Sequence, residues 1–283
     1  MRVLIAGNVI SSRRRVNDGR RQKTIFKDSR GLALAGLGGK AAVDILAPGD
    51  VEASIKALPL TEGKRWAMVI NMPELNDEIM NKCIAACHEE HNVPEFGDPK
   101  VEVKWLWKED YHHSFPDHHN EYIDEKYEHK FLLLACNHCS NPPCCRVCPT
   151  QATWKREDGI VMMDWHRCIG CRFCMAACPY GSRSFNWGDP RKAPKDKNPD
   201  FPTNINYPTR SKGVVEKCTF CDERISKGQL PACVEAANKL KKNVLIFGDL
   251  ADPDSNVRQV LRKNYTIRRK PALGTEPNIF YIV

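Results

Sequence analysis

The cysteines are the residues of this sequence whose type and spacing point most directly to a chemistry. Of 14 cysteines in 283 residues, most fall into two dense runs, at residues 136–149 and 168–179, and each run ends in a Cys-Pro pair. Disulfide frameworks scatter cysteines along a chain, whereas a C-x2-C pair holds two thiolates on one turn for a metal. Zinc ribbons need four ligands for each ion and not two interlocking runs of four. The grouping therefore favours iron–sulfur clusters over zinc or disulfides.

The second run, from Cys168 to Pro179, matches the spacing C-x2-C-x2-C-x3-C-P residue for residue. In that spacing three thiolates surround one 4Fe-4S cube, and the fourth cysteine binds the neighbouring cluster. The first run, from Cys136 to Pro149, also ends with a cysteine before a proline. Two clusters are therefore expected here, each taking one ligand from the other run.

The elements that position these runs are predicted from apolar patterning and turn residues. An apolar run at residues 131–135 is expected to lead as a strand into the first cysteine run. Residues 156–159, Arg-Glu-Asp-Gly, provide the turn of a hairpin that spans residues 152–164. The same patterning predicts strands at residues 66–71, 101–107, 244–248 and 279–283 and a helix at residues 255–264.

The positive charge of the protein is concentrated at its N-terminus. The formal net charge is +8, and residues 1–53 hold ten Lys or Arg and five Asp or Glu, which is a net charge of +5. The excess of +3 on the remaining residues is too small for a nucleic-acid footprint. No nucleic-acid partner is therefore expected.

Residues 1–53 are predicted to be an export signal of the twin-arginine (Tat) type, a route for proteins that fold before export. Paired arginines precede a small apolar run at residues 31–39, and residues 51–54 offer small side chains for cleavage. The alternative is a basic tail on a cytoplasmic protein. After residue 53 no apolar run reaches the roughly 18 residues that a membrane-spanning helix needs. The mature chain is therefore expected to have no transmembrane helix of its own.

The sequence shows no competing chemistry. It lacks a nucleophile elbow, a phosphate-binding loop and a dinucleotide fingerprint. The segment from Cys83 to His88 approximates a haem attachment sequence but has one residue too many for C-x-x-C-H. Neither haem nor flavin is expected, no catalytic residue is assigned, and substrate chemistry is expected on other subunits.

Several short sequences resemble one known family. They are Cys136-Asn-His-Cys139, Cys168-Ile-Gly-Cys171, Lys217-Cys218-Thr-Phe-Cys221 and Pro231-Ala-Cys233-Val. In these short sequences the chain is similar to the four-cluster ferredoxin subunits that accompany membrane oxidoreductases. These subunits include the polysulfide, thiosulfate and dimethyl sulfoxide reductase B-subunit type and the formate-linked nitrite reductase type. The resemblance extends from about residue 66 to the end of the sequence.

The resemblance implies how the cysteines divide among clusters. The family carries four cysteine groups, paired first with fourth and second with third. In each pair, three cysteines of one group and the last cysteine of its mate bind one cluster. Carried over, the first set is Cys136, Cys139, Cys144 and Cys178, the second set is Cys168, Cys171, Cys174 and Cys148, and the third set is Cys218, Cys221, Cys233 and Cys87.

The fourth cluster of the family lacks its ligands in this sequence. Only Cys83 remains for it, and Ala237 stands four residues after Cys233, where the final cysteine is expected. The losses fall together on one site and spare the other three. The resemblance therefore implies three 4Fe-4S clusters and one abandoned site, with Cys83 and Cys145 left as small buried apolar side chains.

The implied fold class is α+β, with two bacterial-ferredoxin-like modules whose short β-hairpins and helices pack around 4Fe-4S clusters. Bound clusters supply much of the cohesion of such small modules. The expected division is an export signal at residues 1–53, the first part of module A at 54–130, module B with two clusters at 131–188, a proline-rich surface loop at 189–212, and the remainder of module A with the C-terminal segment at 213–283.

Several clusters in a row pass single electrons, so the resemblance implies a non-catalytic electron-transfer subunit of an oxidoreductase complex. The missing cluster and the leader at residues 31–44 are most similar to the DsrO iron–sulfur subunits of the Dsr membrane complex (DsrMKJOP), found in sulfate reducers and sulfur oxidisers. The implied partners are a quinone-interacting integral membrane subunit of the NrfD type and a multihaem cytochrome c or other redox subunit. The implied place is the periplasmic face of the cytoplasmic membrane, in dissimilatory sulfur metabolism, with membrane association through the partners.

Two alternatives stay open. Within the same class, the chain is the electron-transfer subunit of a molybdopterin reductase for polysulfide, thiosulfate or dimethyl sulfoxide. In another class, it is a redox-sensing or structural iron–sulfur protein. Neighbouring genes would separate the first two functions, and reversible one-electron reduction by a partner would exclude a sensor.

Overall fold

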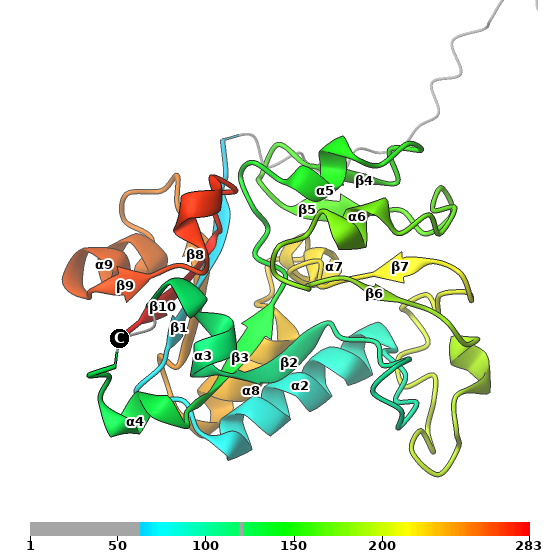
Figure 1. Ribbon diagram of the computed structural model, residues 1–283, viewed down its shortest axis with the longest axis horizontal. Helices are drawn as coiled ribbons and strands as arrows, with labels where there is room; N and C mark the ends of the chain where they lie inside the picture. The colour runs from blue at the N-terminus through cyan, green and yellow to red at the C-terminus, as the bar shows by residue number, and fades with distance from the viewer. Residues whose placement is uncertain (1–62, 119–120) are drawn as a thin grey trace, which may run out of the picture. The chain divides into compact units, whose positions relative to one another are not determined.

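The computed structural model describes residues 63–118 and 121–283, which form a mixed structure of helices and small sheets (Figure 1). The predicted export signal at residues 1–53 lies outside the described residues. The strands are β1 (Trp66–Asn71), β2 (Leu106–Asp110), β3 (Phe131–Ala135), β4 (Thr153–Lys155), β5 (Val161–Met163), β6 (Ser184–Phe185), β7 (Val215–Glu216), β8 (Leu245–Asp249), β9 (Thr266–Ile267) and β10 (Ile279–Ile282). The helices are α2 (Asp77–His91), α3 (Tyr111–Ser114), α4 (Glu125–Glu128), α5 (Pro143–Arg146), α6 (Phe173–Ala176), α7 (Asp222–Ile225), α8 (Ala232–Leu240) and α9 (Asn256–Lys263), with 3-10 turns η1 (Pro116–His118), η2 (Pro190–Lys192) and η3 (Pro271–Leu273).

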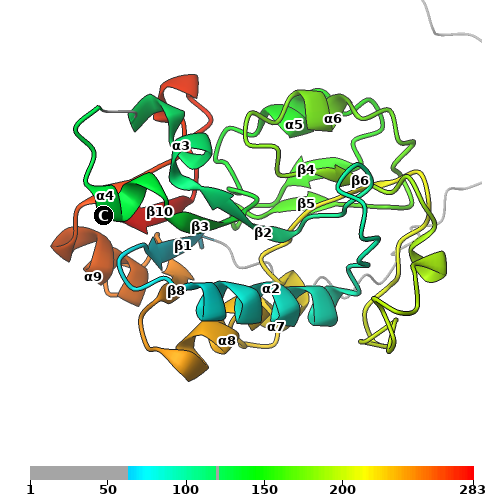
Figure 2. The same ribbon diagram turned by 60° about the horizontal axis from the view of Figure 1, so that its bottom comes forward.

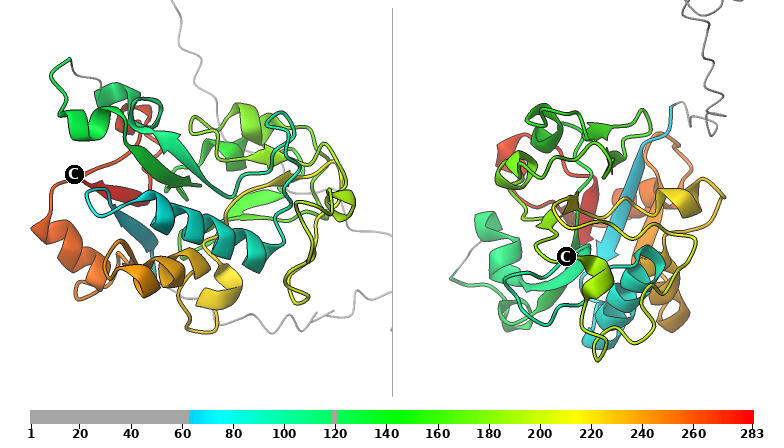
Figure 3. Two further views of the ribbon diagram at one scale, coloured as in Figure 1. Left: turned by 90° about the horizontal axis from the view of Figure 1, so that it is seen from below. Right: turned by 90° about the vertical axis from the view of Figure 1, so that its right-hand side faces the viewer.

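The largest sheet joins the first and last strands of the described residues. Its strand order is β8-β1-β10-β9. Strand β1 runs parallel to β10, with Met68 opposite Ile279, and antiparallel to β8, with Met68 opposite Phe247. The right-hand view of Figure 3 shows β1 in cyan beside β10 in red. Strand β1 lies between β8 and β10, so both of its edges are paired. A strand in a sheet that is buried on both faces is expected to have a continuous apolar sequence.

Both faces of this sheet are covered. Successive side chains of a strand point to opposite faces, and Ala67 and Val69 pack with Val257 of α9 in one apolar cluster. Met68 and Ile70 belong to a larger cluster on the other face, which extends to α2, α8, β2 and β3. That larger cluster is the main core of the protein.

Helix α2 has clear start and stop signals. The Asn76 side chain accepts a hydrogen bond from the Ile79 amide at 2.8 Å, and acidic residues occupy the first turn, where they favour the positive end of the helix dipole. Asn92 ends the helix in the left-handed conformation, with φ 50°. Ile79, Cys83 and Cys87 lie four residues apart and form one buried stripe. This stripe packs against α8, which lies alongside α2 in Figure 2.

A separate part of the fold carries the two long cysteine runs. Strands β4 and β5 form an antiparallel hairpin, and α5 and α6 lie side by side next to it (Figure 2). The predicted hairpin between residues 152 and 164 is confirmed by these strands. The predicted strand at residues 131–135 is confirmed as β3, which pairs with β2.

The predicted strand at residues 101–107 is wrong in its position, because β2 begins only at Leu106. Val103, Trp105 and Trp107 are all buried, which explains the alternating pattern that suggested a strand. Backbone pairing of this segment with another strand is confined to residues 106–110, which lie opposite β3. Before these residues, the Lys104 amide donates to the side-chain hydroxyl of Ser184 at 2.8 Å instead of to a backbone carbonyl of a neighbouring strand.

Candidate iron–sulfur sites

All 14 cysteines lie in the described part of the protein, and none of them forms a disulfide. The structure brings the first set together around one cavity, which is lined by Cys136, Cys139, Cys144 and Cys178. Strand β3 leads directly into Cys136, and the one-turn helix α5 carries Cys144. The other lining residues include Tyr180 and Arg183.

The second set lines another cavity. Cys148, Cys168, Cys171 and Cys174 surround it, together with backbone and side chains of the 168–174 loop. The one-turn helix α6 carries Cys174, which is buried, whereas Cys171 is exposed. This site therefore reaches the protein surface.

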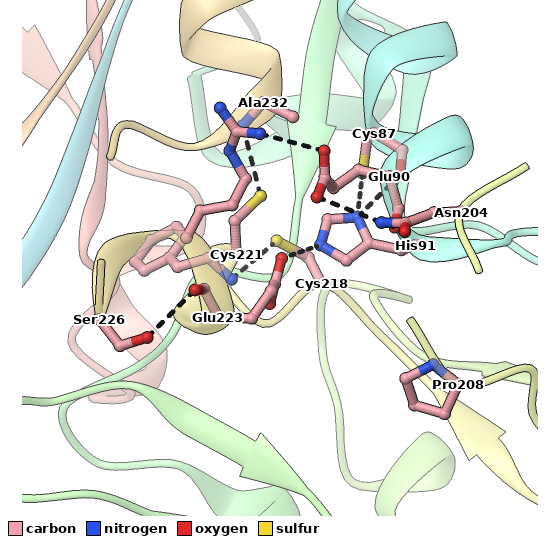
Figure 4. Close-up of polar contacts among 12 residues, drawn as sticks. Cys87, Glu90, His91, Asn204, Pro208, Cys218, Cys221, Glu223, Ser226 and Ala232 are labelled. Carbon is pink, nitrogen blue, oxygen red and sulfur yellow. Dashed lines mark hydrogen bonds and ion pairs between the residues drawn. The ribbon is translucent and has the colours of Figure 1, made fainter. Parts of the chain in front are cut away.

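The third set joins residues that are far apart in the sequence. Cys87 comes from α2, Cys221 is the residue before α7, and Cys233 lies in the first turn of α8. Figure 4 shows the sulfur atoms of Cys218 and Cys221 beside Cys87. Two sulfurs already accept backbone hydrogen bonds, Cys218 from the Phe220 amide and Cys221 from the Ala232 amide, both at 3.4 Å.

The first C-x-x-C turn of each of the three cysteine groups at residues 136–148, 168–178 and 218–233 has the same backbone conformation. The residue before the second cysteine has a positive φ in each turn, 41° at His138, 71° at Gly170 and 58° at Phe220. This left-handed residue reverses the chain and lets both thiols of a pair face the same space. At Gly170 a side chain is also excluded by space, because a Cβ atom would lie 2.3 Å from the carbonyl oxygen of Gly213.

The electrostatics of the thiols fit a bound cationic metal. Burial raises the pKa of Cys139 and that of Cys218 to about 12. It also raises the pKa of Cys87, Cys221 and Cys233 well above the ordinary value for a thiol. Thiolates at such depth require nearby positive charge, which iron supplies when it binds. Three groups of four unpaired thiols thus fit three 4Fe-4S clusters, and the ligand of each iron remains a prediction.

The residues of the predicted abandoned site lie in the core. Cys83 of α2 and Ala237 of α8 are both fully buried, and both belong to the main apolar cluster with Ile79 and Met80. The thiol of Cys83 donates to the carbonyl oxygen of Cys233 at 3.3 Å. Apolar packing therefore occupies this region of the α2–α8 interface. Cys145, the other spare cysteine, is only half-buried and not fully buried as expected.

A histidine beside the third set was missed by the sequence reasoning. His91 is buried at the end of α2, and its Nδ1 lies 2.7 Å from the carbonyl oxygen of Cys87. Its Nε2 lies 3.0 Å from Glu223 Oε1 of α7, as Figure 4 shows. Burial alone would raise the pKa of Glu223, but the hydrogen bond from His91 holds it below its ordinary value. This contact joins two of the segments that carry the third set. The sequence signal for His91 is its position four residues after Cys87, in line with the buried stripe of Ile79, Cys83 and Cys87.

Comparison with known proteins relates this chain to 4Fe-4S iron–sulfur subunits. The family profile described as a 4Fe-4S dicluster domain matches residues 127–195. The chain is 43% identical over 238 residues to the Hdr-like menaquinol oxidoreductase iron-sulfur subunit 1 of Archaeoglobus fulgidus, which covers 78% of this chain and 84% of that protein. It is 32% identical to the iron-sulfur cluster-binding subunit of menaquinone reductase from Nitratidesulfovibrio vulgaris, over 77% of this chain and 88% of the relative. It is 38% identical to the B subunit of polysulfide reductase from Wolinella succinogenes, over 52% of this chain and 64% of the relative.

Proposed function

The protein belongs to the family of ferredoxin-like iron–sulfur subunits of the polysulfide and dimethyl sulfoxide reductase B-subunit type, and on that premise we propose that it passes single electrons through three 4Fe-4S clusters. It is an electron-transfer subunit of an oxidoreductase complex. The proposed ligands are the first, second and third cysteine sets, held in two ferredoxin-like modules. The site of the fourth cluster is replaced by packing around Cys83 and Ala237.

One observation carries this proposal, namely that the three sets are neighbours in a row. Cys144 of the first set and Cys174 of the second set belong to one buried apolar cluster. The ring of His138, between Cys136 and Cys139, stacks on the ring of Phe220, between Cys218 and Cys221, with the ring centroids 3.8 Å apart. The first set is therefore the middle one. Electron transfer weakens steeply with distance and needs such intermediate stops. The exposed Cys171 gives this row an end at the surface, where a partner can exchange electrons.

The proposed partners are a quinone-interacting integral membrane subunit of the NrfD type and a multihaem cytochrome c or other redox subunit. Two of the relatives are named as subunits of a menaquinol oxidoreductase and of a menaquinone reductase, which supports a quinone-linked role. No helix in residues 63–118 and 121–283 is long and apolar enough to cross a bilayer. We infer that the chain is exported and attaches to the periplasmic face of the membrane through its partners. Its proposed role in sulfur metabolism is that of a DsrO-type subunit.

The alternative of a molybdopterin reductase subunit also has a supporting observation, because the B subunit of polysulfide reductase is a relative. The two proposals differ in the complex and not in the chemistry of this chain. Purification of the native complex separates them, since a bound multihaem cytochrome supports the first proposal and a molybdopterin subunit supports the second.

The test of the shared chemistry is metal analysis and redox titration of the anaerobically purified protein. We expect about twelve iron atoms and twelve acid-labile sulfides per chain. We also expect electron paramagnetic resonance (EPR) to show three reversible one-electron reductions. The reduced protein should be reoxidised by a partner at least as fast as the complex turns over. Bound zinc or a colourless protein would overturn the proposal. Clusters that neither accept nor return electrons to a partner would favour the sensor or structural alternative.

A further inference from the structure

Two buried cations lie among the cysteine sets. The side chain of Arg183 is 4% exposed, and its Nη2 donates to the Thr153 hydroxyl at 2.8 Å. Lys217 is fully buried, and its Nζ donates to the carbonyl oxygens of Val161 and of Cys218, the second at 2.7 Å. Within residues 63–118 and 121–283, neither cation forms an ion pair with a carboxylate.

A buried cation without a counter-charge is strongly unfavourable, so these two side chains need a source of negative charge. Of the other buried guanidinium groups in the described residues, that of Arg210 has such a source, because Glu216 lies 2.6 Å away. That of Arg269 forms no ion pair there; it lies 5.4 Å from the ring of Tyr180, which lines the first cavity, and its Nε donates to the carbonyl oxygen of Ser114. Four thiolates around an iron–sulfur cube carry a net negative charge. A cluster is therefore the natural counter-ion for Arg183 and for Lys217.

Both cations border the cavity of the first set. Arg183 lines this cavity itself, and its Nη1 lies 3.7 Å from the sulfur of Met163, which lines the cavity of the second set. Lys217 donates to Val161, another residue of the first cavity, and precedes Cys218 of the third set. Arg183 thus lies between the first and second sets, and Lys217 lies between the first and third.

Only the first set has both cations as neighbours. Burial raises the pKa of Cys136, and the charges of Lys217 and Arg183 act against that rise. The third set has the carboxylate of Glu223 beside Cys221, which adds negative charge. The second set includes the exposed Cys171, where water screens charges.

We propose that Arg183 and Lys217 are positioning residues that act as counter-charges of the first-set cluster and make it the first of the three clusters to be reduced. The reduced cluster carries one more negative charge than the oxidised cluster. Nearby cations therefore stabilise the reduced state more and raise the reduction potential. One electron enters from the quinol or haem partner, which is oxidised by one electron, and no bond forms or breaks at the cluster. This inference rests on the proposed function and adds the order of reduction.

The middle position of the first set gives this order a consequence for electron flow. With clusters bound, the first-set cluster would be the most readily reduced of the three. It would therefore hold an electron that entered from either end until the partner at the second or third set accepted it.

The test is an EPR-monitored redox titration of the anaerobic holoprotein and its variants. In Arg183→Gln and in Lys217→Gln, we expect the reduction equilibrium constant of the first-set cluster to fall at least tenfold, which is a potential lower by 59 mV. The conservative variants Arg183→Lys and Lys217→Arg keep the positive charge and should stay closer to the wild type. Lys192→Gln is the control, because Lys192 is an exposed cation of η2 that lines neither of the two cavities. It should leave the first-set potential within a few millivolts of the wild type, because water screens its charge.

Assignment of the signals uses ligand variants. Cys171→Ser and Cys221→Ser should remove or alter the signals of the second and third sets and so identify that of the first. If Arg183→Gln does not accumulate, Lys217→Gln and the two conservative variants provide the same comparison. The inference is overturned if another cluster is reduced first or if the Gln variants of Arg183 and Lys217 have the same first-set potential as the Lys192→Gln control. In those cases a full complement of three redox-active clusters would still leave the proposed function standing, whereas missing iron in the wild type would remove both.

Discussion

The ion pair between Arg210 and Glu216 offers a sharp test of what holds the third cysteine set in place. Both side chains are fully buried, and their charged atoms are 2.6 Å apart. Glu216 also accepts a hydrogen bond from Trp105 Nε1 at 2.8 Å. Arg210 donates to the carbonyl oxygens of His91 and Asn92, at the end of the helix that carries Cys87. The perturbation is Glu216→Gln, which keeps the shape of the side chain and removes its charge.

The magnitude follows from the burial of the pair. Removal of one partner of a buried ion pair costs about 3 to 5 kcal/mol, because the other charge is left uncompensated. The carbonyl oxygens around Arg210, and the ring of Trp105 at 5.1 Å, retain part of the stabilisation of its charge. We therefore expect a loss near the lower end, about 3 kcal/mol. In a protein of this size that corresponds to a Tm lower by roughly 6 to 12 °C.

The assay is thermal unfolding of the anaerobic holoprotein at a fixed scan rate, with iron release followed in parallel. Glu102→Gln is the control, because Glu102 pairs with Lys104 at 3.2 Å while both side chains are more than a third exposed. Exposed pairs contribute at most about 1 kcal/mol, so the control should lose no more than about 4 °C.

The double variant Arg210→Gln/Glu216→Gln removes both charges and should recover part of the loss of either single variant. A Glu216→Gln protein with the Tm of the control would refute this reasoning.

Four further predictions concern single residues. Cys174→Ser should lose the second-set cluster, about a third of the iron, and destabilise the neighbouring cluster; unchanged iron would contradict the ligand set. Cys83→Ala should keep all iron and all EPR signals at a cost of about 1 kcal/mol in stability, and a lost signal would show Cys83 to be a ligand. Ala237→Cys should lower stability by about 1 to 3 kcal/mol through overpacking without adding a cluster, so additional iron would contradict the abandoned site. Burial lowers the pKa of His88 to about 4, below the roughly 6.5 of an unfolded chain, so the unfolded state binds the proton first and stability falls as the pH drops from about 6.5 towards 4. His88→Gln should weaken that fall in Tm, and equal slopes in the two proteins would exclude the explanation.

Local elements were predictable where the sequence carries a local signal. The helix predicted at residues 255–264 is α9, and its side-chain cap is Ser255, which accepts a hydrogen bond from the Arg258 amide. Helix α2 was not predicted, although Asn76 and the acidic residues after it are an ordinary start signal. The parallel pairing of β1 with β10 had no local signal, because it joins segments about 200 residues apart.

The candidate sites divide in the same way. Cysteine spacing predicts which thiols share a turn, and the resemblance to a family adds the pairing of distant groups such as Cys87 with Cys233. The charged surroundings were not predictable from spacing. Arg183 and Lys217 lie next to cysteine motifs, but nothing local distinguishes a buried cation from a solvated one. Their burial depends on segments that meet only in the folded protein.

The adjacency of β1 and β10 sets the sequence of events during synthesis. A ribosome completes β1 long before it makes the strand that must lie against it. All ligands proposed for the first and second sets precede residue 179, whereas Cys87 cannot meet Cys221 and Cys233 until α7 and α8 have been made. Filling of the third set thus reports that the polypeptide has reached its distal part. A nascent chain that stalls before α8 is made would be released without its full set of clusters and would be exposed to proteases.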